Sequence, residues 1–408
     1  MTQADYDMVI VGGGMVGASL ACALGNSELR VAVVEAIAPG EPGQPSYDDR
    51  TIALAYSSRR IFEGIGIWDH IAQRSASPIE HIHISDRGHF GFTRLHASDM
   101  GIEALGYVAE TRALGAALYE AMANYSNIEL ICPASVSAVD IVEHKAELTI
   151  DKGGKLGKIS AQLAIAADGG DSPLRRAIGI EANRHEYDQA AIVANVTPGK
   201  DHRNTAYERF TSTGPLALLP MPGKRCAVVW STTKDNVDSM LGWSDEEYLA
   251  RLQERFGDRL GRFERAGKRV AYPLALTRVK QSVSHCVALI GNAAHTVHPV
   301  AGQGFNLGLR DVATLAQVVV DASRSGKDIG SLEVLGPYAA WRKRDNQRVA
   351  TFTDGLIRVF TNDFLPLMLA RNVGLSLVNL FPSVKRTFIR RTSGLNGRLP
   401  RLARGLPL

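Results

Sequence analysis

The first 36 residues constrain the fold more than any other part of the chain, because they alternate a strand, a glycine turn, a helix and a second strand. Residues 5–25 read DYDMVIVGGGMVGASLACALG, in which an apolar run passes through the turn into a helix of small residues. RVAVVEA then supplies the second strand at residues 30–36. Gly12, Gly14 and Gly17 form the pattern G-x-G-x-x-G, which within a β-α-β unit is typical of dinucleotide-binding α/β domains.

Each glycine of this pattern has a distinct physical task. Gly12 permits the tight turn, Gly14 lets a pyrophosphate approach the backbone, and Gly17 lets the helix pack close to the sheet. Glu35 ends the second strand at the offset expected of an acid that accepts hydrogen bonds from the adenosine ribose hydroxyls. The segment therefore predicts that the chain binds a dinucleotide, either FAD or NAD.

Two later segments repeat the order of strand, glycine turn and helix. Asp168 and Gly169 follow the apolar run of LAIAADGGDSPLRRAIGI. Gly291 and Asn292 follow that of VSHCVALIGNAAHTVHP. Asp-Gly also marks plain strand-to-helix turns, so the first of these segments alone is weak evidence. Because an NAD-only dehydrogenase has no evident use for two such distant segments, together they favour FAD.

The length and composition indicate an ordinary globular protein of about two domains. The chain has 408 residues, of which 45% are hydrophobic and 22% are charged. Its cysteines form no C-x-x-C pair, so neither a disulfide framework nor a thiolate zinc site is expected from Cys22, Cys132, Cys226 and Cys286. The N-terminus lacks the basic region and the long apolar segment of a signal peptide, and we expect a cytoplasmic protein.

The C-terminal segment carries the excess positive charge. No acidic residue follows Asp363, whereas eight basic residues do: Arg371, Lys385, Arg386, Arg390, Arg391, Arg398, Arg401 and Arg404. Nucleic-acid binding is typical of segments with aromatic stacking groups or a known binding module, whereas this segment supplies mainly Leu, Val and Phe. We therefore expect no nucleic-acid partner, and expect the segment to contact either a membrane surface, as a peripheral protein does, or a protein complex.

The most apolar part of this segment is FLPLMLARNVGLSLVNLF, at residues 364–381. Because Arg371 and Asn372 interrupt it, it is too broken for a membrane-spanning helix but could lie along a bilayer surface. An equally plausible alternative is that its apolar residues only dock a helix on the body of the protein. These residues are Leu367, Met368, Leu375, Val378 and Phe381.

Taken together and in order, these segments resemble the flavin-dependent aromatic hydroxylases of the para-hydroxybenzoate hydroxylase fold, over nearly the whole chain. The resemblance implies that the glycine pattern and Glu35 bind the ADP half of FAD. It places Asp168 and Gly169 between the flavin and NAD(P)H sites, and Gly291 and Asn292 at the ribityl chain. The family commonly has Asp where this chain has Asn292, which leaves open the effect on cofactor affinity or redox potential.

Further cofactor contacts follow from the same resemblance. Arg50, in DDRTIAL, and Arg112, in VAETRALGAAL, match family positions near the pyrophosphate and ribityl groups, which a guanidinium suits. The loop P-x-x-G-Q-G would bring backbone N–H groups and a helix N-terminus to the flavin pyrimidine, where negative charge develops on reduction. It comprises Pro299, Gly302, Gln303 and Gly304. His295 and His298 lack a third ligand, so no metal site is expected.

Within this superfamily the chain is similar to the ubiquinone-biosynthesis hydroxylases, especially those acting on 2-polyprenyl-6-methoxyphenol. The stretches HISDRGHFGF, AYERFTSTGPLALLPMP and AGKRVAYPLALT carry this likeness and lie outside the flavin motifs. The implied α/β fold has a Rossmann-like FAD-binding domain, an inserted sheet-based substrate domain and a basic helical C-terminal tail. The expected ranges are 1–70, 105–180 and 283–350 for the first, 71–104 and 181–282 for the second, and 351–408 for the tail.

The implied reaction uses NAD(P)H to reduce FAD and O2 to hydroxylate an electron-rich, polyprenylated phenol. Only one dinucleotide pattern is present, so NAD(P)H is expected to visit transiently. No catalytic base can be named, because His89, Tyr207 and Arg209 lie in substrate-domain stretches but could equally be structural. Three alternatives remain: hydroxylation at another ring position, a flavin dehydrogenase or reductase acting on a prenyl substrate, and a non-catalytic flavoprotein scaffold.

Overall fold

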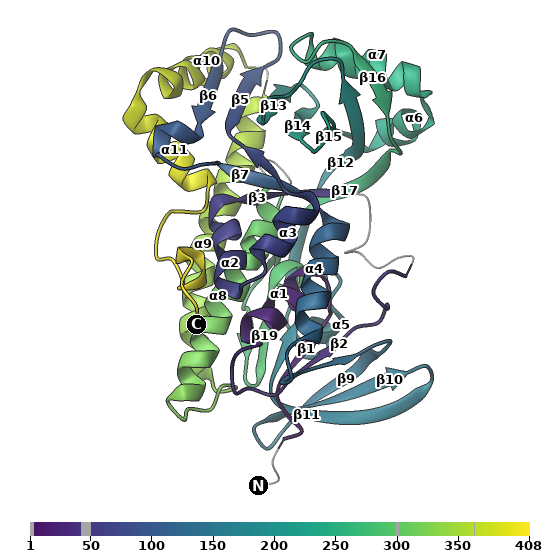
Figure 1. The fold of residues 1–408 in the computed structure, drawn as a ribbon, viewed down its shortest axis with the longest axis vertical. Coiled ribbons are helices and arrows are strands. Elements are labelled where there is room, and N and C mark those ends of the chain that lie inside the picture. The colour runs from purple at the N-terminus through teal and green to yellow at the C-terminus, as the bar shows by residue number, and fades with distance from the viewer. Residues whose placement is uncertain (1–3, 42–49, 299–301, 363) are drawn as a thin grey trace.

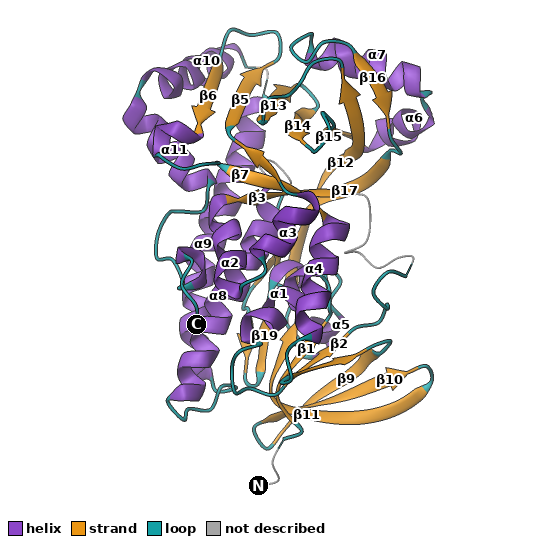
Figure 2. Ribbon diagram, in the orientation of Figure 1, coloured by secondary structure: helices purple, strands orange, loops and turns teal. Residues whose placement is uncertain are grey.

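The computed structural model describes residues 4–41, 50–298, 302–362 and 364–408. In this part of the chain, helices pack against two large sheets and one small sheet (Figures 1 and 2). One large sheet occupies the lower half of Figure 1 and the other the upper half, with the small sheet between them. The expected α/β architecture, with an inserted sheet and C-terminal helices, is confirmed.

The lower sheet is the Rossmann-like one, and its strand order is β18-β19-β11-β1-β2-β8. Strands β19, β11, β1, β2 and β8 are parallel to one another, whereas β18 pairs with β19, and the hairpin of β9 and β10 pairs with β11, in the antiparallel direction. The strands are β1 (Tyr6–Val11), β2 (Val31–Val34), β8 (Ile128–Ile131), β9 (Ser135–Val142), β10 (Lys145–Lys152), β11 (Lys155–Ala166), β18 (Val283–Ser284) and β19 (Val287–Leu289). The continuous apolar runs of β1 and β2 suit parallel strands that are covered on both faces.

Long helices cover one face of this sheet. They are α1 (Met15–Leu24), α4 (Thr111–Ala123), α8 (Gln303–Arg324) and α9 (Leu332–Phe360), and the short α5 (Pro173–Ala177) contacts β9. Helix α1 packs against both α4 and α8. The main hydrophobic core lies between these helices and the sheet, and includes Ile10, Leu20 and Leu309 with no exposed surface.

The upper sheet contains the substrate-domain strands, in the order β20-β17-β12-β15-β14-β13-β5-β6, with β16 paired to β12. They are β5 (His81–Asp86), β6 (Phe92–His96), β12 (Ala182–Pro198), β13 (Thr205–Thr211), β14 (Gly214–Pro220), β15 (Cys226–Thr233), β16 (Phe263–Ala266), β17 (Val270–Val279) and β20 (His295–Thr296). Helices α6 (Val237–Gly242) and α7 (Asp245–Phe256) lie beside it. Ser244 caps α7 by accepting a hydrogen bond from the Glu247 amide at 3.1 Å, as the spacing S-x-x-E predicts.

The small sheet joins the two large ones. It contains β3 (Thr51–Ala55), β7 (Gly106–Glu110) and β4 (Ser77–Ile79). Helices α2 (Tyr56–Ile65) and α3 (Trp68–Ser75) lie between β3 and β4 in the chain. Strand β20 follows the glycine segment at residue 291 yet pairs with β17 of the upper sheet. The chain segments of the two expected domains are therefore interleaved.

The C-terminal segment is mostly helical, with α10 (Leu365–Leu380) and α11 (Pro382–Thr392) following α9. Helix α9 continues through residues 350 and 351, so the tail has no structural break at that point. Helix α10 covers the edge strand β6. There the side-chain oxygens of Asn372 and Asn379 accept hydrogen bonds from the amides of Gly91, at 2.7 Å, and Arg94, at 3.1 Å. These bonds satisfy backbone groups that an open sheet edge would leave exposed.

The last residues return to the lower core. Leu402 and Ala403 are 1% and 0% exposed and belong to the main hydrophobic core. The C-terminal segment is thus partly integral to the fold. No single helix in the described ranges is long and apolar enough to cross a membrane. Helices α10 and α11 together are long and apolar enough, but the chain bends by 101° between them.

Candidate cofactor and substrate site

The three glycine segments meet because their strands are neighbours with the same direction. The Gly12 amide donates to the Val34 carbonyl at 2.8 Å, at the end of β2. The Ala167 amide donates to the Val11 carbonyl at 2.8 Å, which joins the ends of β11 and β1. The Ile290 amide donates to Ala166 at 3.0 Å, which brings in the end of β19. This edge of a parallel sheet is where open α/β folds bind ligands.

The G-x-G-x-x-G glycines occupy three different environments. Gly12 has φ +102°, and a Cβ there would lie 2.5 Å from the Ala167 carbonyl oxygen. A Cβ on Gly17 would lie 1.9 Å from the Gly12 oxygen, so the close approach of α1 to the strand requires glycine. Gly14, at the N-cap of α1, faces open space, because nothing lies within 4 Å of its Cβ position. This open space at a helix N-terminus fits a pyrophosphate group.

Glu35 is fixed beside this turn. Its Oε2 accepts a hydrogen bond from the Gly13 amide at 2.6 Å, and its Oε1 accepts one from the Ile37 amide at 2.9 Å. A carboxylate oxygen can accept a second bond, so both oxygens can still receive ribose hydroxyls. The sequence did not single out Gly13, whose Cβ would lie 2.6 Å from the Tyr119 hydroxyl, or Tyr119, which donates to the Gly13 carbonyl at 2.8 Å.

The side chain of Arg175 links the Asp168 segment to the Gly291 segment. Its Nη1 donates to the Ala293 carbonyl at 2.8 Å and its Nη2 to the Gly170 carbonyl at 2.9 Å. Asp168 caps α5 by accepting from the Leu174 amide at 3.1 Å. Its other oxygen, Oδ1, is buried and accepts no hydrogen bond from any described residue, and burial raises the pKa of this carboxyl. A cofactor hydroxyl donating to Oδ1 would satisfy this oxygen.

The Gly291 turn presents Asn292 outward. Gly291 has φ +57° and starts a short 3-10 turn, Gly291–Ala293, in which Asn292 is exposed. An exposed amide at the end of β19 fits a ribityl hydroxyl. Gly169, with φ +93°, also faces open space at its Cβ position.

A buried charge network, which no sequence motif indicates, holds this turn. Asp311 of α8 accepts hydrogen bonds from the Gly291 amide at 2.9 Å, His295 Nε2 at 2.7 Å and Arg342 Nε at 2.6 Å. Burial alone would raise the pKa of Asp311, but His295 and Arg342 lower it to about 2. His295 therefore forms a hydrogen bond, as the sequence suggests, but it lies in the short strand β20 and not in a loop, and His298 is also buried.

Gly302, at the N-terminus of α8, lies against β3. Gly302 is left-handed, with φ +60°, and a Cβ there would lie 2.9 Å from the Cβ of Ala53. Gln303 Nε2 donates to the Thr392 carbonyl at 3.3 Å, and nothing lies within 4 Å of the Gly304 Cβ position. Open space at the start of a 22-residue helix fits a group that becomes negative. Pro299 lies outside the described residues.

Asn306 anchors this loop, although sequence reasoning missed it. Its side-chain oxygen accepts hydrogen bonds from the Ala55 amide at 2.8 Å and the Ser58 hydroxyl at 2.6 Å. Its amide nitrogen donates to the Ala53 carbonyl at 2.8 Å and the Gly302 carbonyl at 2.6 Å. The start of α8 is therefore tied to the end of β3.

The two expected arginines lie near one another in the fold. The Arg50 guanidinium carbon is 4.8 Å from the centre of the Tyr272 ring, and the Arg50 carbonyl accepts a hydrogen bond from the Thr111 amide at 2.9 Å. Arg112 follows directly, in the first turn of α4, and is exposed. The structure thus brings both arginines to the region between β3 and α4.

The three residues considered as a catalytic base do not lie on the face of β13 that packs against β7 and α9. His89 is exposed in the turn between β5 and β6. Tyr207 lies on the face of β13 that packs against α7, with its ring 5.2 Å from that of Phe256. Strand alternation places Arg209 on the same face. Ala206 and Phe210 face the other way, in clusters with residues of β7 and α9.

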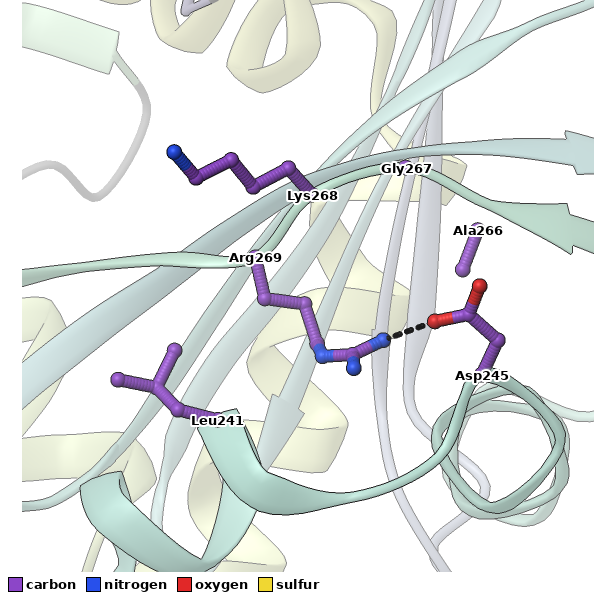
Figure 3. A pocket seen from close by; sticks show the side chains of 6 residues that line it. All are labelled: Leu241, Asp245, Ala266, Gly267, Lys268 and Arg269. Carbon is purple, nitrogen blue, oxygen red and sulfur yellow. Dashed lines mark hydrogen bonds and ion pairs between the residues drawn. The ribbon is translucent and has the colours of Figure 1, made fainter.

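An open surface pocket lies at the far edge of the upper sheet. It is lined by Leu241, Asp245, Ala266, Gly267, Lys268 and Arg269. Figure 3 shows Arg269 reaching Asp245, with Nη1 and Oδ1 2.6 Å apart. Because α6, α7 and β16 lie away from the glycine turns in Figure 1, we assign this pocket no part in cofactor binding.

Comparisons with known proteins agree with this geometry. Residues 5–353 match the family model described as FAD binding domain. The chain is 39% identical over 406 residues to the ubiquinone hydroxylase UbiL of Rhodospirillum rubrum, covering 98% of this chain and 93% of that protein. It is 32% identical over 400 residues to the 3-demethoxyubiquinol 3-hydroxylase of Escherichia coli, covering 97% and 100%.

A solved structure supports the same fold. The p-nitrophenol 4-monooxygenase PnpA of Pseudomonas putida superposes with a TM-score of 0.81 at 19% identity, covering 97% of this chain and 100% of that one. The expected family and its cofactor FAD are confirmed. The chain belongs to the FAD-binding domain family and, within it, to the ubiquinone-biosynthesis hydroxylases.

Proposed function

We propose that this protein is an FAD-dependent monooxygenase that hydroxylates the aromatic ring of a polyprenylated phenol, 2-polyprenyl-6-methoxyphenol, in ubiquinone biosynthesis. One atom of O2 enters the ring and converts a C–H bond into C–OH, while the other leaves as water. NAD(P)H supplies the two electrons and, with a solvent proton, the hydrogens of that water. Bound FAD supplies the chemistry that passes these electrons to O2.

One observation carries the proposal. The turns at Gly12, Asp168 and Gly291 meet at one sheet edge, beside open space at the N-terminus of α1. We assign Gly12, Gly14 and Gly17 to the pyrophosphate turn and Glu35 to the ribose. The remaining assignments are Arg50, Arg112, Asp168 and Gly169 near the pyrophosphate and ribityl chain, Gly291 and Asn292 at the ribityl hydroxyls, and Pro299, Gly302, Gln303 and Gly304 at the flavin pyrimidine.

The chain's own residues bind and orient the cofactor in this scheme. The N-terminal end of α8 offers positive potential to the pyrimidine side of the ring. Asn306 and Asp311 hold the two turns around it through the hydrogen bonds described above. The upper sheet then encloses the phenol over the ring and keeps water away.

NAD(P)H consumption tests the redox part of the proposal. FAD-loaded protein should oxidise NAD(P)H slowly alone and faster when a short-chain 2-prenyl-6-methoxyphenol is added, with formation of a dihydroxy product. Loss of NAD(P)H without product would point to a reductase, and no phenol-dependent oxidation would contradict the proposal.

We further propose that α10 and α11 dock the enzyme on an anionic membrane surface. Leu369, Val373 and Leu377 form an apolar row on α10 with exposures of 48%, 48% and 45%. The opposite face is buried and polar, since Arg371 Nε bonds Asp86 Oδ2 at 2.8 Å. This polarity is the reverse of that of an ordinary surface helix.

The positive charges on α11 favour binding to an anionic membrane surface. Arg386, Arg390 and Arg391 are exposed, and basic groups beside an apolar row suit the headgroups of an anionic bilayer. Of the apolar residues that could have docked the helix, Leu375 does pack against the protein, whereas Phe381 is 53% exposed. A bilayer is also where a polyprenyl substrate dissolves.

Point variants test this docking better than truncation, because removing the segment would take Leu402 and Ala403 out of the core. Full-length FAD-loaded protein should float with vesicles of phosphatidylcholine and phosphatidylglycerol, and Leu377→Glu should abolish this. Leu156→Glu is the matched control, since Leu156 is 70% exposed on β11. Absence of flotation by the wild type, or equal flotation by Leu377→Glu, would reject the membrane in favour of a protein partner.

A further inference from the structure

Glu208 lies on β13, the third strand from the β6 edge of the upper sheet, on the face opposite Tyr207 and Arg209. It occupies the middle of β13, between Ala206 and Phe210 on the same face. Ala206 belongs to a hydrophobic cluster with Val108 of β7, and Phe210 stacks on Phe360 of α9 with ring centres 3.7 Å apart. The carboxyl of Glu208 therefore points toward the cofactor-binding part of the molecule.

Apolar residues lie beside Glu208 across the upper sheet. Strand register places Ala217, Val229 and Val193 beside it in a row on β14, β15 and β12. Glu208 and these three residues are partly accessible, whereas Ala206 and Phe210, which flank Glu208 on the same face of β13, are buried. Glu208 is therefore the polar group in a partly accessible row that is otherwise apolar.

The small sheet connects this face of β13 to Gly302 at the start of α8. Ala53 and Val108 are directly paired across β3 and β7, and directly paired residues share a face of the sheet. Ala53 lies against Gly302 of the loop, while Val108 shares a cluster with Ala206 of β13. A planar ring placed between the loop and β13 would thus have Glu208 along one side.

The side chain of Glu208 forms no hydrogen bond or ion pair with any described residue, and burial raises its pKa to about 7. Burial is the only cause of this rise. The charged groups on the surrounding elements are occupied with partners of their own or lie on the other face. The groups with partners of their own are the ion pairs Arg225–Glu110, Arg371–Asp86 and Arg358–Asp354. The groups near His83, on the face that packs against α7, are Arg94, Arg209 and Arg259.

We propose that Glu208 is the catalytic base that accepts the proton of the phenolic hydroxyl. This inference rests on the proposed function. The ionised carboxylate accepts a hydrogen bond from the phenol O–H and takes its proton as the ring is hydroxylated, which leaves the electron pair on the phenolic oxygen and enriches the ring carbon that gains oxygen. The proton then returns to solvent. A base that titrates near neutral pH is suited to this transfer.

Glu208→Gln tests the assignment, because it keeps the shape of the side chain and removes its ionisation. Glu264→Gln is the matched control, since Glu264 is exposed on β16 of the same sheet. Product formation by Glu208→Gln should fall about 100-fold, with FAD content and melting temperature retained at about pH 6. Glu264→Gln should match the wild type.

Ligand binding without turnover provides a second readout. Phenols keep their proton until about pH 10, so the affinity of wild-type protein for 2-prenyl-6-methoxyphenol should rise about three- to tenfold between about pH 6 and pH 8 as Glu208 ionises. The rise should vanish in Glu208→Gln, and the methyl ether of the same phenol should show no rise with any variant.

The two readouts separate the outcomes. Unchanged product formation and an unchanged pH dependence of binding in Glu208→Gln would overturn the role of Glu208 and leave the proposed function standing. A wild type that binds the phenol but forms no hydroxylated product would overturn the proposed function, and with it the inference.

Discussion

Individual residues at this site are recognisable by the space around them. Gly14 faces open space at the N-terminus of α1, whereas Gly12 and Gly17 are held by backbone atoms within 2.5 Å and 1.9 Å of their Cβ positions. A side chain at Gly12 or Gly17 would disturb the fold itself. A side chain at Gly14 would only occupy the space that we assign to the cofactor, so this position separates binding from folding.

Gly14→Ala should weaken FAD binding and leave the fold intact. A methyl group there displaces the pyrophosphate from the backbone amides, and losing one hydrogen bond to a charged group lowers affinity about ten- to a hundredfold. Titration of apoprotein with FAD measures this. Gly336→Ala is the control, because Gly336 also faces open space but lies in α9. Equal FAD affinity in the two variants would contradict the pyrophosphate assignment.

The raised pKa of Glu208 predicts a pH-dependent difference in stability. The folded state holds its proton up to about pH 7, above the ordinary value of 4.5, so the folded state binds more protons than the unfolded state within this window. Stability contributed by this group therefore falls as pH rises through the window, by up to about 3 kcal/mol. Relative to wild type, Glu208→Gln should be more stable at about pH 8 than at about pH 5. A pH-independent difference in chemical denaturation would count against this.

Elements bring together residues that are far apart in the chain, and Asp311 of α8 is the main case. It holds the Gly291 turn, His295 and Arg342 from one buried position, with 1% of its side chain exposed. The same helix carries Asp321, whose side chain is 50% exposed where it pairs with Arg401. Substituting each aspartate in turn therefore allows a buried ion pair and a surface ion pair on the same helix to be compared.

Asp311→Asn should destabilise the protein by about 3–5 kcal/mol, because it removes one member of a buried ion pair and leaves Arg342 with Asp345 as its remaining counter-charge. Asp321→Asn should cost less than about 1 kcal/mol, as exposed pairs do. Chemical denaturation of the FAD-loaded variants measures both. Similar losses in the two variants would mean that the buried network does not hold the turn.

How far the sequence predicts these elements depends on how local their causes are. The turns at Gly12, Asp168 and Gly291 could be predicted, since each combines an apolar strand with a residue type that a tight turn requires. The Ser244 cap was equally local. Asn306 and Asp311 could not, because their partners are set by how α8 packs on β3 and β19. Tyr207 and Glu208 are adjacent, and only the packing of α7 decides which face each one occupies.

In the whole molecule, the helices that we propose to dock on a membrane lie at one edge of the sheet that carries Glu208. Helix α10 covers β6 at one end of the upper sheet, and β5 then separates β6 from β13, which carries Glu208. Figure 1 shows α10 and α11 on the outer flank of that sheet. If α10 and α11 dock on a bilayer as we propose, the polyprenyl tail of the substrate can remain in the bilayer while its ring reaches Glu208.

Isotope labelling tests the central claim, ring hydroxylation, most directly. FAD-loaded wild-type protein would be supplied with NAD(P)H, a short-chain 2-prenyl-6-methoxyphenol and ¹⁸O2, and the product analysed by mass spectrometry and NMR. We predict a dihydroxy product that contains one ¹⁸O atom on a ring carbon, which also identifies the position hydroxylated. Recovery of unlabelled phenol while NAD(P)H is consumed, or a product whose new oxygen comes from water, would contradict the assignment of this protein as a monooxygenase.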